Sequence, residues 1–437
     1  MKKFLRTIRN IIAIEELRDR ILNTLGFLVI FRLGSFVVLP GVDPSKLTGT
    51  STGILGLLDT FLGGAFSNAS IFGLGVMPYI SASIVLQLLT VSVPYFQKMQ
   101  KEGESGRKKI NQITRVLTIF ITIFQSSAYI SGAIPKEAIV VNQMLFTFSS
   151  MVILTAGTIF IMWLGERITE KGIGNGISML IMIGIISRFP GALIAEASTK
   201  GMSGALLFII EIVALFFVVV GVVALTQAVR RVPVQYAKQV VGNRVYGGQR
   251  QYIPLKVNAA GVMPIIFAQS LMFLPALLAN IWADQSDIAS YIGTTFSNYL
   301  SWQYNLLFGI LIVLFTFFYT AITINPTQIA DDMKRNGGFI PGIKPGKQTS
   351  EYIDNILTKI TLPGSFFLAI VAILPAFATI AGVGGQFSQF YGGTSLLIMV
   401  GVILDTLQQI ESYLLMRHYE GLMKSGKIKG RSSVAVA

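Results

Sequence analysis

The sequence predicts an all-α integral membrane protein with ten transmembrane helices, and three observations carry that prediction. Hydrophobic residues make up 52% of the 437 residues and charged residues only 13%, well below the roughly 25% charged residues of average soluble domains. The chain contains ten apolar runs, each close to the ~20 residues that a helix needs to cross a bilayer. Basic residues alternate in number between the segments that connect these runs, as expected of a multi-spanning membrane protein.

The ten apolar runs follow one another along most of the chain. The run at 177–195 is the weakest, because Arg188 and Pro190 interrupt it. The predicted spans are 21–39, 73–92, 114–133, 147–165, 177–195, 206–226, 258–280, 305–325, 360–380 and 394–415.

The charge of the connecting segments predicts the orientation of the chain. With the N-terminus placed inside, the inner segments hold most of the 35 Lys and Arg residues, and the outer segments hold only Lys46, Lys136, Arg188 and Lys200. Cytoplasmic loops of membrane proteins carry the excess of Lys and Arg. Both termini are therefore expected in the cytoplasm, and the net charge of +14 mostly reflects topology.

Ten spans divide into two sets of five, one in residues 1–200 and one in residues 201–437. Since five is odd, the two halves must have opposite orientations, and any structural repeat between them would be inverted. Two inner loops, 227–257 and 326–359, are longer than typical connections between elements. Both are basic, which makes them candidates for a docking surface that receives a large acidic partner.

The stretch "DTFLGGAFSNASIFGLGVMPYISAS" (59–83) is too apolar for an ordinary loop and too interrupted for a spanning helix. Glycine costs a helix about 1 kcal/mol relative to alanine, and Gly63 and Gly64 are adjacent. Non-helical backbone at membrane depth is tolerated only where protein or water surrounds it. We therefore expect the segment to lie inside the protein rather than against lipid.

The sequence contains almost none of the motifs or residues that indicate an enzyme. It has no P-loop and no zinc-protease or serine-hydrolase motif, no Cys, and one His, His418. No metal site or cofactor is expected. Arg32, Glu211 and Asp405 are ionisable residues in or near the spans, where such residues are often functional. They leave an ion-coupled secondary transporter with an inverted repeat open as the alternative function.

Several long motifs identify a family. They are "GVMPYISASIVLQLLT" (75–90), "KEGESGRKKI" (101–110), "MWLGERITEKGIGNGIS" (162–178), "YAKQVVGNRVYGGQ" (236–249), "PLKVNAAGVMPIIFA" (254–268), "GFIPGIKPGKQT" (338–349) and "GGTSLLIMVGVILDT" (392–406). In this order and nearly from end to end, they resemble the bacterial SecY family, the pore subunits of the Sec protein-conducting channel.

The resemblance implies an hourglass pore between the two inverted halves, closed by a plug and by a ring of aliphatic side chains. The plug of the family is a short helix that falls at about 54–66 here, and includes Leu55, Leu57, Leu58, Phe61, Leu62, Gly63, Gly64 and Phe66. The ring falls on six isoleucines, which can seal a pore by dewetting. They are Ile80, Ile84, Ile181, Ile185, Ile266 and Ile398.

The resemblance also implies a lateral gate and docking sites. Positions that match the gate carry the polar residues Gln87, Thr90, Gln125 and Asn258, whose interhelical contacts are worth only about 0.6–2 kcal/mol. Candidate contacts to the ribosome or a motor are Lys238, Arg244, Arg250 and Lys344. Lys344 stands where the family usually has Arg, and it offers a point charge instead of a bidentate fork.

The partners implied by the family are small SecE-like and SecG-like membrane subunits, the SecA motor ATPase, the ribosome, signal peptides with their nascent chains, and membrane lipid. The implied location is the bacterial inner membrane. The implied function is to pass unfolded polypeptides across that membrane and to release transmembrane helices sideways into lipid, with no enzymatic step in this chain.

Overall fold

The computed structural model describes residues 14–47, 59, 62–201, 204–236, 239–241, 244–246, 250–269, 271–272, 295 and 298–424. The described residues form two compact units. The first takes in those up to Arg188 and again those from Gly401 onward, and the second takes in those of Phe189–Val400. Both boundaries fall inside helices, α8 (Gly176–Lys200) and α16 (Gly393–Lys424). At these two boundaries the chain passes from one unit to the other within a helix.

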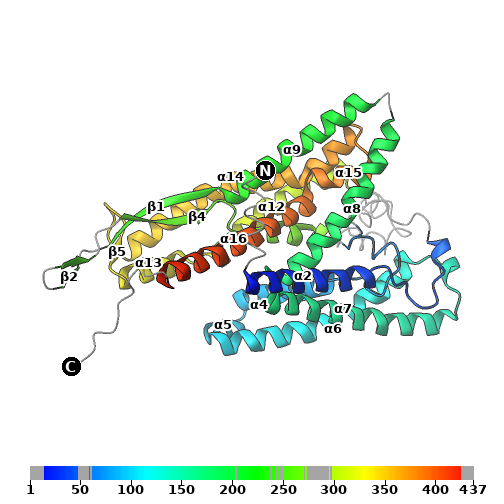
Figure 1. Ribbon diagram of the computed structural model, residues 1–437, viewed down its shortest axis with the longest axis horizontal. Helices are drawn as coiled ribbons and strands as arrows, with labels where there is room; N and C mark the ends of the chain where they lie inside the picture. Colours follow the sequence, from blue (N-terminus) through cyan, green and yellow to red (C-terminus); the bar gives the residue numbers. More distant parts are fainter. Residues whose placement is uncertain are drawn as a thin grey trace. The chain divides into compact units, whose positions relative to one another are not determined.

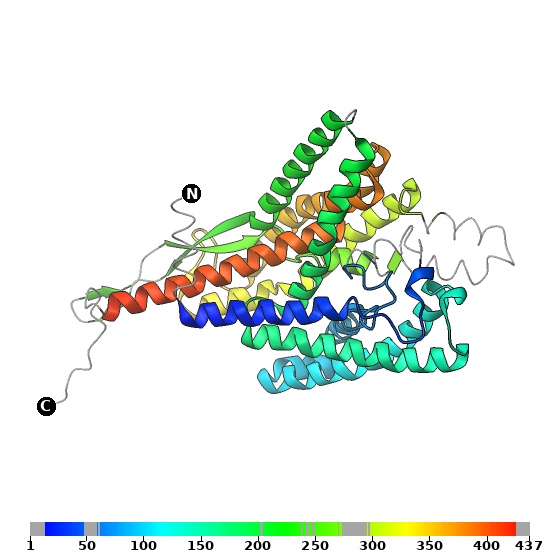
Figure 2. The same cartoon turned by 45° about the vertical axis from the view of Figure 1, so that its right-hand side comes forward.

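The first unit is built on long helices that pack in sequence order. Its other helices are α2 (Glu15–Gly34), α4 (Met77–Ser92), α5 (Pro94–Lys101), α6 (Glu104–Ala133) and α7 (Gln143–Lys171). α2 packs against α7, α4 against α6, and α6 against α7; Figures 1 and 2 both show α6 and α7 side by side.

The ends of these helices follow from local sequence. Asn142 begins α7 by accepting a hydrogen bond from the Met144 backbone, as favoured N-cap residues do. Pro94 is the first residue of α5, a position where proline is tolerated because its missing N–H would make no hydrogen bond within the helix. Proline also disfavours a helical conformation for the residue before it, which separates α5 from α4. Short 3₁₀ turns, η1 (Pro44–Lys46) and η2 (Lys136–Ala138), lie in the connecting segments. Isolated β-bridges join these segments at Val38–Ser70 and at Val42–Ile139.

The second unit combines helices with a small sheet. The helices are α9 (Ala205–Gln227), α12 (Trp302–Thr323), α13 (Pro326–Arg335), α14 (Lys347–Ile380) and the short α15 (Gly385–Ser388), which leads into a 3₁₀ turn, η3 (Gln389–Tyr391). α12 packs along α14, and α13 also contacts α14. Residues 263–269, 271 and 272 are helical too.

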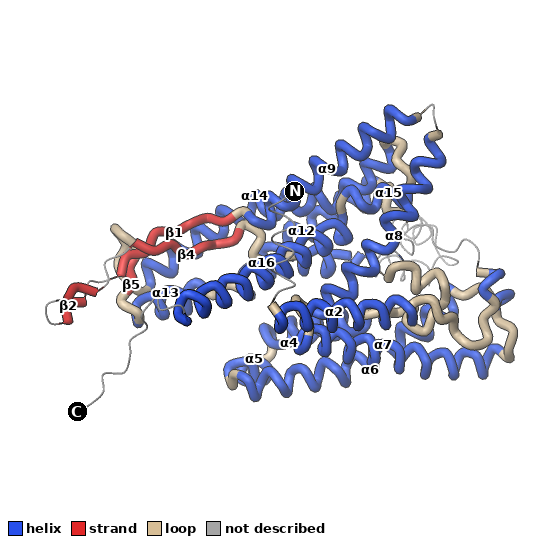
Figure 3. The backbone as a smooth tube through the Cα atoms, viewed as in Figure 1, coloured by secondary structure: helices blue, strands red, loops and turns tan. Residues whose placement is uncertain are grey.

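The sheet is a feature that the sequence analysis missed. Its strands β4 (Arg250–Lys256), β1 (Val229–Tyr236) and β5 (Gly338–Phe339) are antiparallel in the order β4-β1-β5. In the register of β1 and β4, Val229 lies opposite Lys256 and Gln235 opposite Arg250. A separate pair, β2 (Gln239–Val241) and β3 (Arg244–Tyr246), lies between β1 and β4 in the chain. All five strands gather in one region of Figure 3.

The two long loops expected at 227–257 and 326–359 thus supply a folded element. Val232 and Val234 of β1 pack with Leu255 of β4 and with Ile353 and Leu357 of α14 in a buried cluster. The alternation of buried and exposed residues along β1 is the normal strand pattern. The predicted helical membrane fold is confirmed, but the all-α description is incomplete.

The membrane character of the helices is clear from their surfaces. α9 has a mean hydropathy of 3.1 over its best 18-residue window, and only 11% of that window is buried within the protein. An apolar helix with so little of its surface buried within the protein is expected to contact lipid. Among the described residues, seven helices are long and apolar enough to span a bilayer, or eight if α4 and α5 form one broken span.

The predicted count of ten is consistent with this finding. Nine of the predicted spans coincide with helices α2, α4, α6, α7, α8, α9, α12, α14 and α16. The remaining span, 258–280, lies partly outside the described residues. α8 remains helical through Pro190, so the interruption noted in the sequence does not end that span.

Candidate functional site

The interrupted segment before α4 folds as a packed chain of turns. Residues 62–69 and 71–76 form turns. Of the expected helix at 54–66, the structure describes Asp59, which is helical, and residues 62–66, which are not. Leu55, Leu57, Leu58 and Phe61 lie outside the described residues. Leu62 is 5% exposed and Ala65 and Ala69 are 1% exposed, whereas Asn68 is exposed. Most of the described turns are therefore enclosed by protein, as expected from the sequence.

Two adjacent glycines allow the segment to approach its neighbours. Gly63 and Gly64 have φ of 60° and 93°, a left-handed conformation that only glycine adopts readily. A Cβ at Gly63 would lie 2.8 Å from the backbone of Gly184, and a Cβ at Gly64 would lie 2.9 Å from the Arg188 guanidinium. The glycines that made the segment look unsuitable for a helix are required by this packing.

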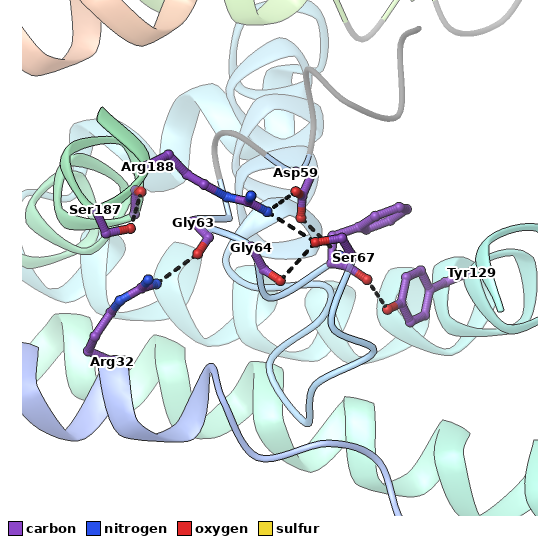
Figure 4. A network of polar contacts seen from close by, with 10 residues as sticks. Arg32, Asp59, Gly63, Gly64, Ser67, Tyr129, Ser187 and Arg188 are labelled. Atoms are coloured by element: carbon purple, nitrogen blue, oxygen red, sulfur yellow. Dashed lines mark hydrogen bonds and ion pairs between the residues drawn. The ribbon is translucent and has the colours of Figure 1, made fainter. Parts of the chain in front are cut away.

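Two arginines bind the segment from two different helices (Figure 4). Arg32 of α2 donates to the Gly63 carbonyl at 2.8 Å. Arg188 of α8 forms an ion pair with Asp59 and donates to the Ser67 hydroxyl at 3.0 Å. The Asp59 side chain is 5% exposed and the Arg188 side chain 34%. The carboxylate is therefore buried with a cationic partner, as buried charges normally are.

Further hydrogen bonds complete the network around the ion pair. The Ser67 backbone N–H donates to Asp59 Oδ1 at 2.8 Å, and its hydroxyl donates to the Gly64 carbonyl at 3.2 Å. From α6, the Tyr129 hydroxyl donates to the Phe66 carbonyl at 2.6 Å (Figure 4). The sequence marks Arg32 and Arg188 as charges within predicted spans, but nothing in it links them to Asp59, because the residues are so far apart in the chain.

The six isoleucines of the predicted pore ring are divided between the units. Ile80 and Ile84 lie one turn apart on α4, and Ile181 and Ile185 one turn apart on α8, all in the first unit. Ile266 and Ile398 belong to the second unit. None of the six is exposed: Ile84 is 8%, Ile181 9%, Ile185 0% and Ile398 6% exposed, and Ile80 and Ile266 are half-buried. The ring itself stays a prediction.

The predicted gate residues carry unused polar atoms. Gln87 Oε1 and Asn258 Oδ1 are buried and find no hydrogen-bond partner among the described residues. Thr90 donates to the Gln87 carbonyl of its own helix at 2.7 Å and Gln125 is half-buried on α6. Since buried polar atoms are normally hydrogen-bonded, Gln87 and Asn258 are free to accept a bond from an incoming group.

The predicted docking residues lie in or beside the sheet. Lys344 is exposed in the turn before α14, and its carbonyl accepts a bond from the Thr349 hydroxyl at 2.9 Å. Arg244 is in β3 and Arg250 begins β4, while Lys238 lies outside the described residues. The sequence analysis did not single out Arg230 and Arg231, which are exposed on β1. The sequence feature that could have identified these two arginines is their position directly before Val232 and Val234, which alternate with polar residues as in a strand.

A second buried ion cluster accounts for Glu211. Lys200 Nζ lies 2.8 Å from Glu211 and 3.6 Å from Glu196, and it donates to the Gly382 carbonyl at 2.8 Å. The Tyr391 hydroxyl donates to the Glu211 carbonyl oxygen at 2.6 Å. Burial, and after it the carboxylates of Glu211 and Glu196, raise the pKa of Tyr391 above its ordinary value, so the hydroxyl stays protonated as a donor.

These pairings reduce the case for ion-coupled transport. Glu211 and Arg32 each have a partner, and Asp405 is exposed on α16. A transporter gathers unpaired ionisable groups around discontinuous helices near the middle of the bilayer, and the described residues show no such gathering.

The fold and the site together define a class: a multi-spanning helical membrane protein with an enclosed chain of turns before a span, held by charges among apolar helices. Comparison with known proteins narrows the class. The SecY family model matches residues 70–407. The chain is 47% identical over 426 residues to a protein translocase subunit SecY of Streptomyces griseus, covering 94% of this chain and 97% of the relative. This chain belongs to the SecY family.

Other comparisons agree on family and fold. A protein translocase subunit SecY of Mycobacterium tuberculosis (strain ATCC 25618 / H37Rv) is 41% identical over 449 residues, covering 97% of this chain and 100% of the relative. A solved protein-conducting channel shares the fold with a TM-score of 0.64 at 18% identity, covering 90% of this chain and 92% of that one. Sec61 from a canine ribosome-channel complex gives 0.59 at 17% identity, with the same coverage.

Proposed function

We propose that this chain is the pore-forming subunit of a protein translocase. It passes unfolded polypeptides across a membrane and releases apolar helices into the bilayer. The observation that carries this proposal is the match, over 94% of the chain, to a relative named as a protein translocase subunit. The buried chain of turns between α2 and α4 supports it, because an element held in a helical bundle by glycines and polar contacts is easier to displace than a spanning helix.

The proposed pore lies between two inverted halves, residues 1–200 and 201–437. The division rests on the five predicted spans in each half, because an odd number gives the two halves opposite orientations. Helices α6 and α12, the third and eighth predicted spans, hold corresponding places in the two halves. Each buries residues at intervals of four, including Thr118 and Thr122 on α6 and Thr316 and Thr320 on α12.

The closing elements follow from the same proposal. Residues 54–66 act as a plug, the six isoleucines seal the pore by dewetting, and the gate beside Gln87, Thr90, Gln125 and Asn258 opens to admit a signal helix. The unpartnered amide oxygens of Gln87 and Asn258 suit a gate that exchanges contacts. The chain is a conduit and performs no reaction of its own.

The proposed partners dock on the basic sheet. Arg230 and Arg231 are exposed on β1 and Lys344 is exposed in the turn before α14, and Arg and Lys side chains bind RNA phosphates. The ribosome and a SecA-type motor are therefore assigned to the sheet and to the turn at Lys344. SecE-like and SecG-like subunits are assigned to the apolar faces of the spanning helices. The membrane is the bacterial inner membrane, with both termini in the cytoplasm.

Reconstitution tests the proposed function. Vesicles containing this chain with its small subunits, a motor and ATP should protect a secreted precursor from external protease, whereas vesicles without the chain should not. Solute uptake driven by a proton gradient in the absence of a motor would favour the transporter instead. Vesicles that protect no precursor, although the chain is inserted and the motor is active, would contradict the proposal.

A further inference from the structure

Residues 62–67 are held by charge and by backbone hydrogen bonds, not by apolar packing alone. We propose that the Asp59–Arg188 ion pair, together with the bond from Arg32 to the Gly63 carbonyl, is a latch that determines how strong a signal sequence must be to open the channel. This inference rests on the proposed function. It assigns Arg32, Asp59 and Arg188 as positioning residues that act on the threshold of opening.

The latch joins three separate elements at one point. Arg32 comes from α2 and Arg188 from α8, and Asp59 lies 129 residues before Arg188 in the chain. The hypothetical Cβ positions of Gly63 and Gly64 lie 2.9 Å from the Arg32 and Arg188 guanidinium nitrogens respectively. Both cations therefore contact neighbouring residues of the same turn.

The charges make the latch cooperative. Two guanidinium groups contact this turn and Asp59 is the one carboxylate paired with them in the contacts of the described residues. Like charges that share a small, poorly solvated space repel each other. Removing Asp59 therefore eliminates one attraction and leaves the two cations opposed, so the held state is weakened by more than one bond.

The same chemistry makes the latch reversible. A carboxylate and a guanidinium that separate into a water-filled path become hydrated, which offsets part of the broken pairing. Arg188 is already one-third exposed, with a side-chain exposure of 34%, so water can reach it. An apolar contact has no comparable compensation when it opens. A polar latch thus suits an element that must release when a signal sequence arrives and return afterwards.

Charge removal gives the first test. Asp59→Asn keeps the shape of the side chain and removes its charge. In the reconstituted translocase it should raise transport of a precursor with a defective signal sequence by about tenfold, equivalent to about 1.4 kcal/mol of held-state stability. Transport with the intact signal should stay within about twofold, and Arg188→Gln should act likewise. Asp43→Asn is the matched control, because the hydrogen bonds that the Asp43 carboxylate accepts among the described residues are local ones from Ser45.

A double variant separates a latch from general damage. If the two groups act on each other, Asp59→Asn with Arg188→Gln should raise defective-signal transport less than the product of the single effects. Single variants that leave the stringency of the parent unchanged, at equal protein levels, would overturn the latch. Independent, multiplying effects of the two changes would overturn the pairing as its cause.

A reversible crosslink tests the latch without weakening the fold. The chain has no Cys, so Asp59→Cys with Arg188→Cys can be joined by a short bis-maleimide, which adds to both thiols and whose spacer contains a reducible disulfide. The joined form should lose transport of the intact precursor, and reduction should restore it. Equal transport before and after reduction would overturn the latch alone. Failure of the parent to transport any precursor would overturn the proposed function.

Discussion

At the scale of single residues, the chain holds its buried charges in compensated sets. Lys200 forms ion pairs with two carboxylates, Glu196 and Glu211, whose side chains are 4% and 6% exposed. Glu196 also accepts a bond from the Gly384 backbone at 2.9 Å. A buried charge whose partner is removed is strongly destabilising, at about 3–5 kcal/mol. The lysine is therefore the critical member of the set.

Replacing that lysine gives a direct prediction. Lys200→Met keeps the length of the side chain and leaves both carboxylates without their cation. We expect a loss of about 3 kcal/mol, at the lower end of the range for buried pairs, because Lys200 keeps 16% exposure. The midpoint of thermal unfolding in detergent measures it. The control is Lys46→Met at an exposed position, and equal midpoints for both variants would contradict the assigned role.

Glycine at position 64 is a second prediction at this scale. Gly64→Ala places a Cβ in a left-handed conformation and 2.9 Å from Arg188. A left-handed L-residue costs about 1–2 kcal/mol, so the unfolding midpoint should fall. Gly132→Ala is the control, since its Cβ meets nothing within 4 Å and alanine favours a helix. A Gly64→Ala variant as stable as the parent would show that the turn adjusts freely.

At the scale of elements, the strands and the turn before α14 carry the basic residues that we propose for docking. Charge reversal of Arg244, Arg250 and Lys344 to Glu should weaken ribosome binding and reduce its salt dependence, by roughly 0.7–0.9 in slope for each RNA phosphate that is no longer bound. Sedimentation of ribosomes with vesicles over a salt series measures this effect. Lys136→Glu, in η2 of the first unit, is the control and should have no effect. An unchanged slope would remove Arg244, Arg250 and Lys344 from docking.

The elements also show what could be predicted from the sequence. The spanning helices were predictable because a bilayer demands a fixed length of apolar residues, and α7, α9 and α12 each coincide with one predicted span. The sheet was not predicted, since β2 and β3 have three residues each and the basic residues of the loop obscured the alternation in β1. The ion pair of Asp59 with Arg188 was not predictable, because local sequence does not indicate contacts over 129 residues.

At the scale of the whole molecule, topology is the first prediction. Because the chain has no Cys, a single introduced Cys reports its own position. Lys46→Cys and Lys136→Cys should react with an impermeant thiol reagent from outside the cell. Arg107→Cys and Lys347→Cys should react only after the membrane is opened. Reversed reactivity at two of these sites would discard the predicted ten-span orientation.

The proposed seal is the second prediction for the whole molecule. Ile84→Asn with Ile266→Asn places amides in the predicted ring, at about 1–3 kcal/mol each if they stay dry. The closed pore should therefore admit water and conduct more ions in a planar bilayer without substrate. Ile84→Val is the control, because it keeps the apolar surface. Conductance equal to the parent for the Asn variant would place the pore elsewhere.

The length of α14 has a mechanical consequence. Its 34 residues make a rod of about 51 Å, whereas the hydrocarbon layer is only about 30 Å thick. Ile353 and Leu357, near its N-terminus, belong to the buried cluster of the sheet, and its later turns pack along α12. A partner that presses on the sheet therefore presses on the N-terminal end of α14, whose other end lies in the bilayer. Force applied in water thus reaches the membrane along one helix, and Pro363 and Pro375 within it are the points where that helix bends most easily.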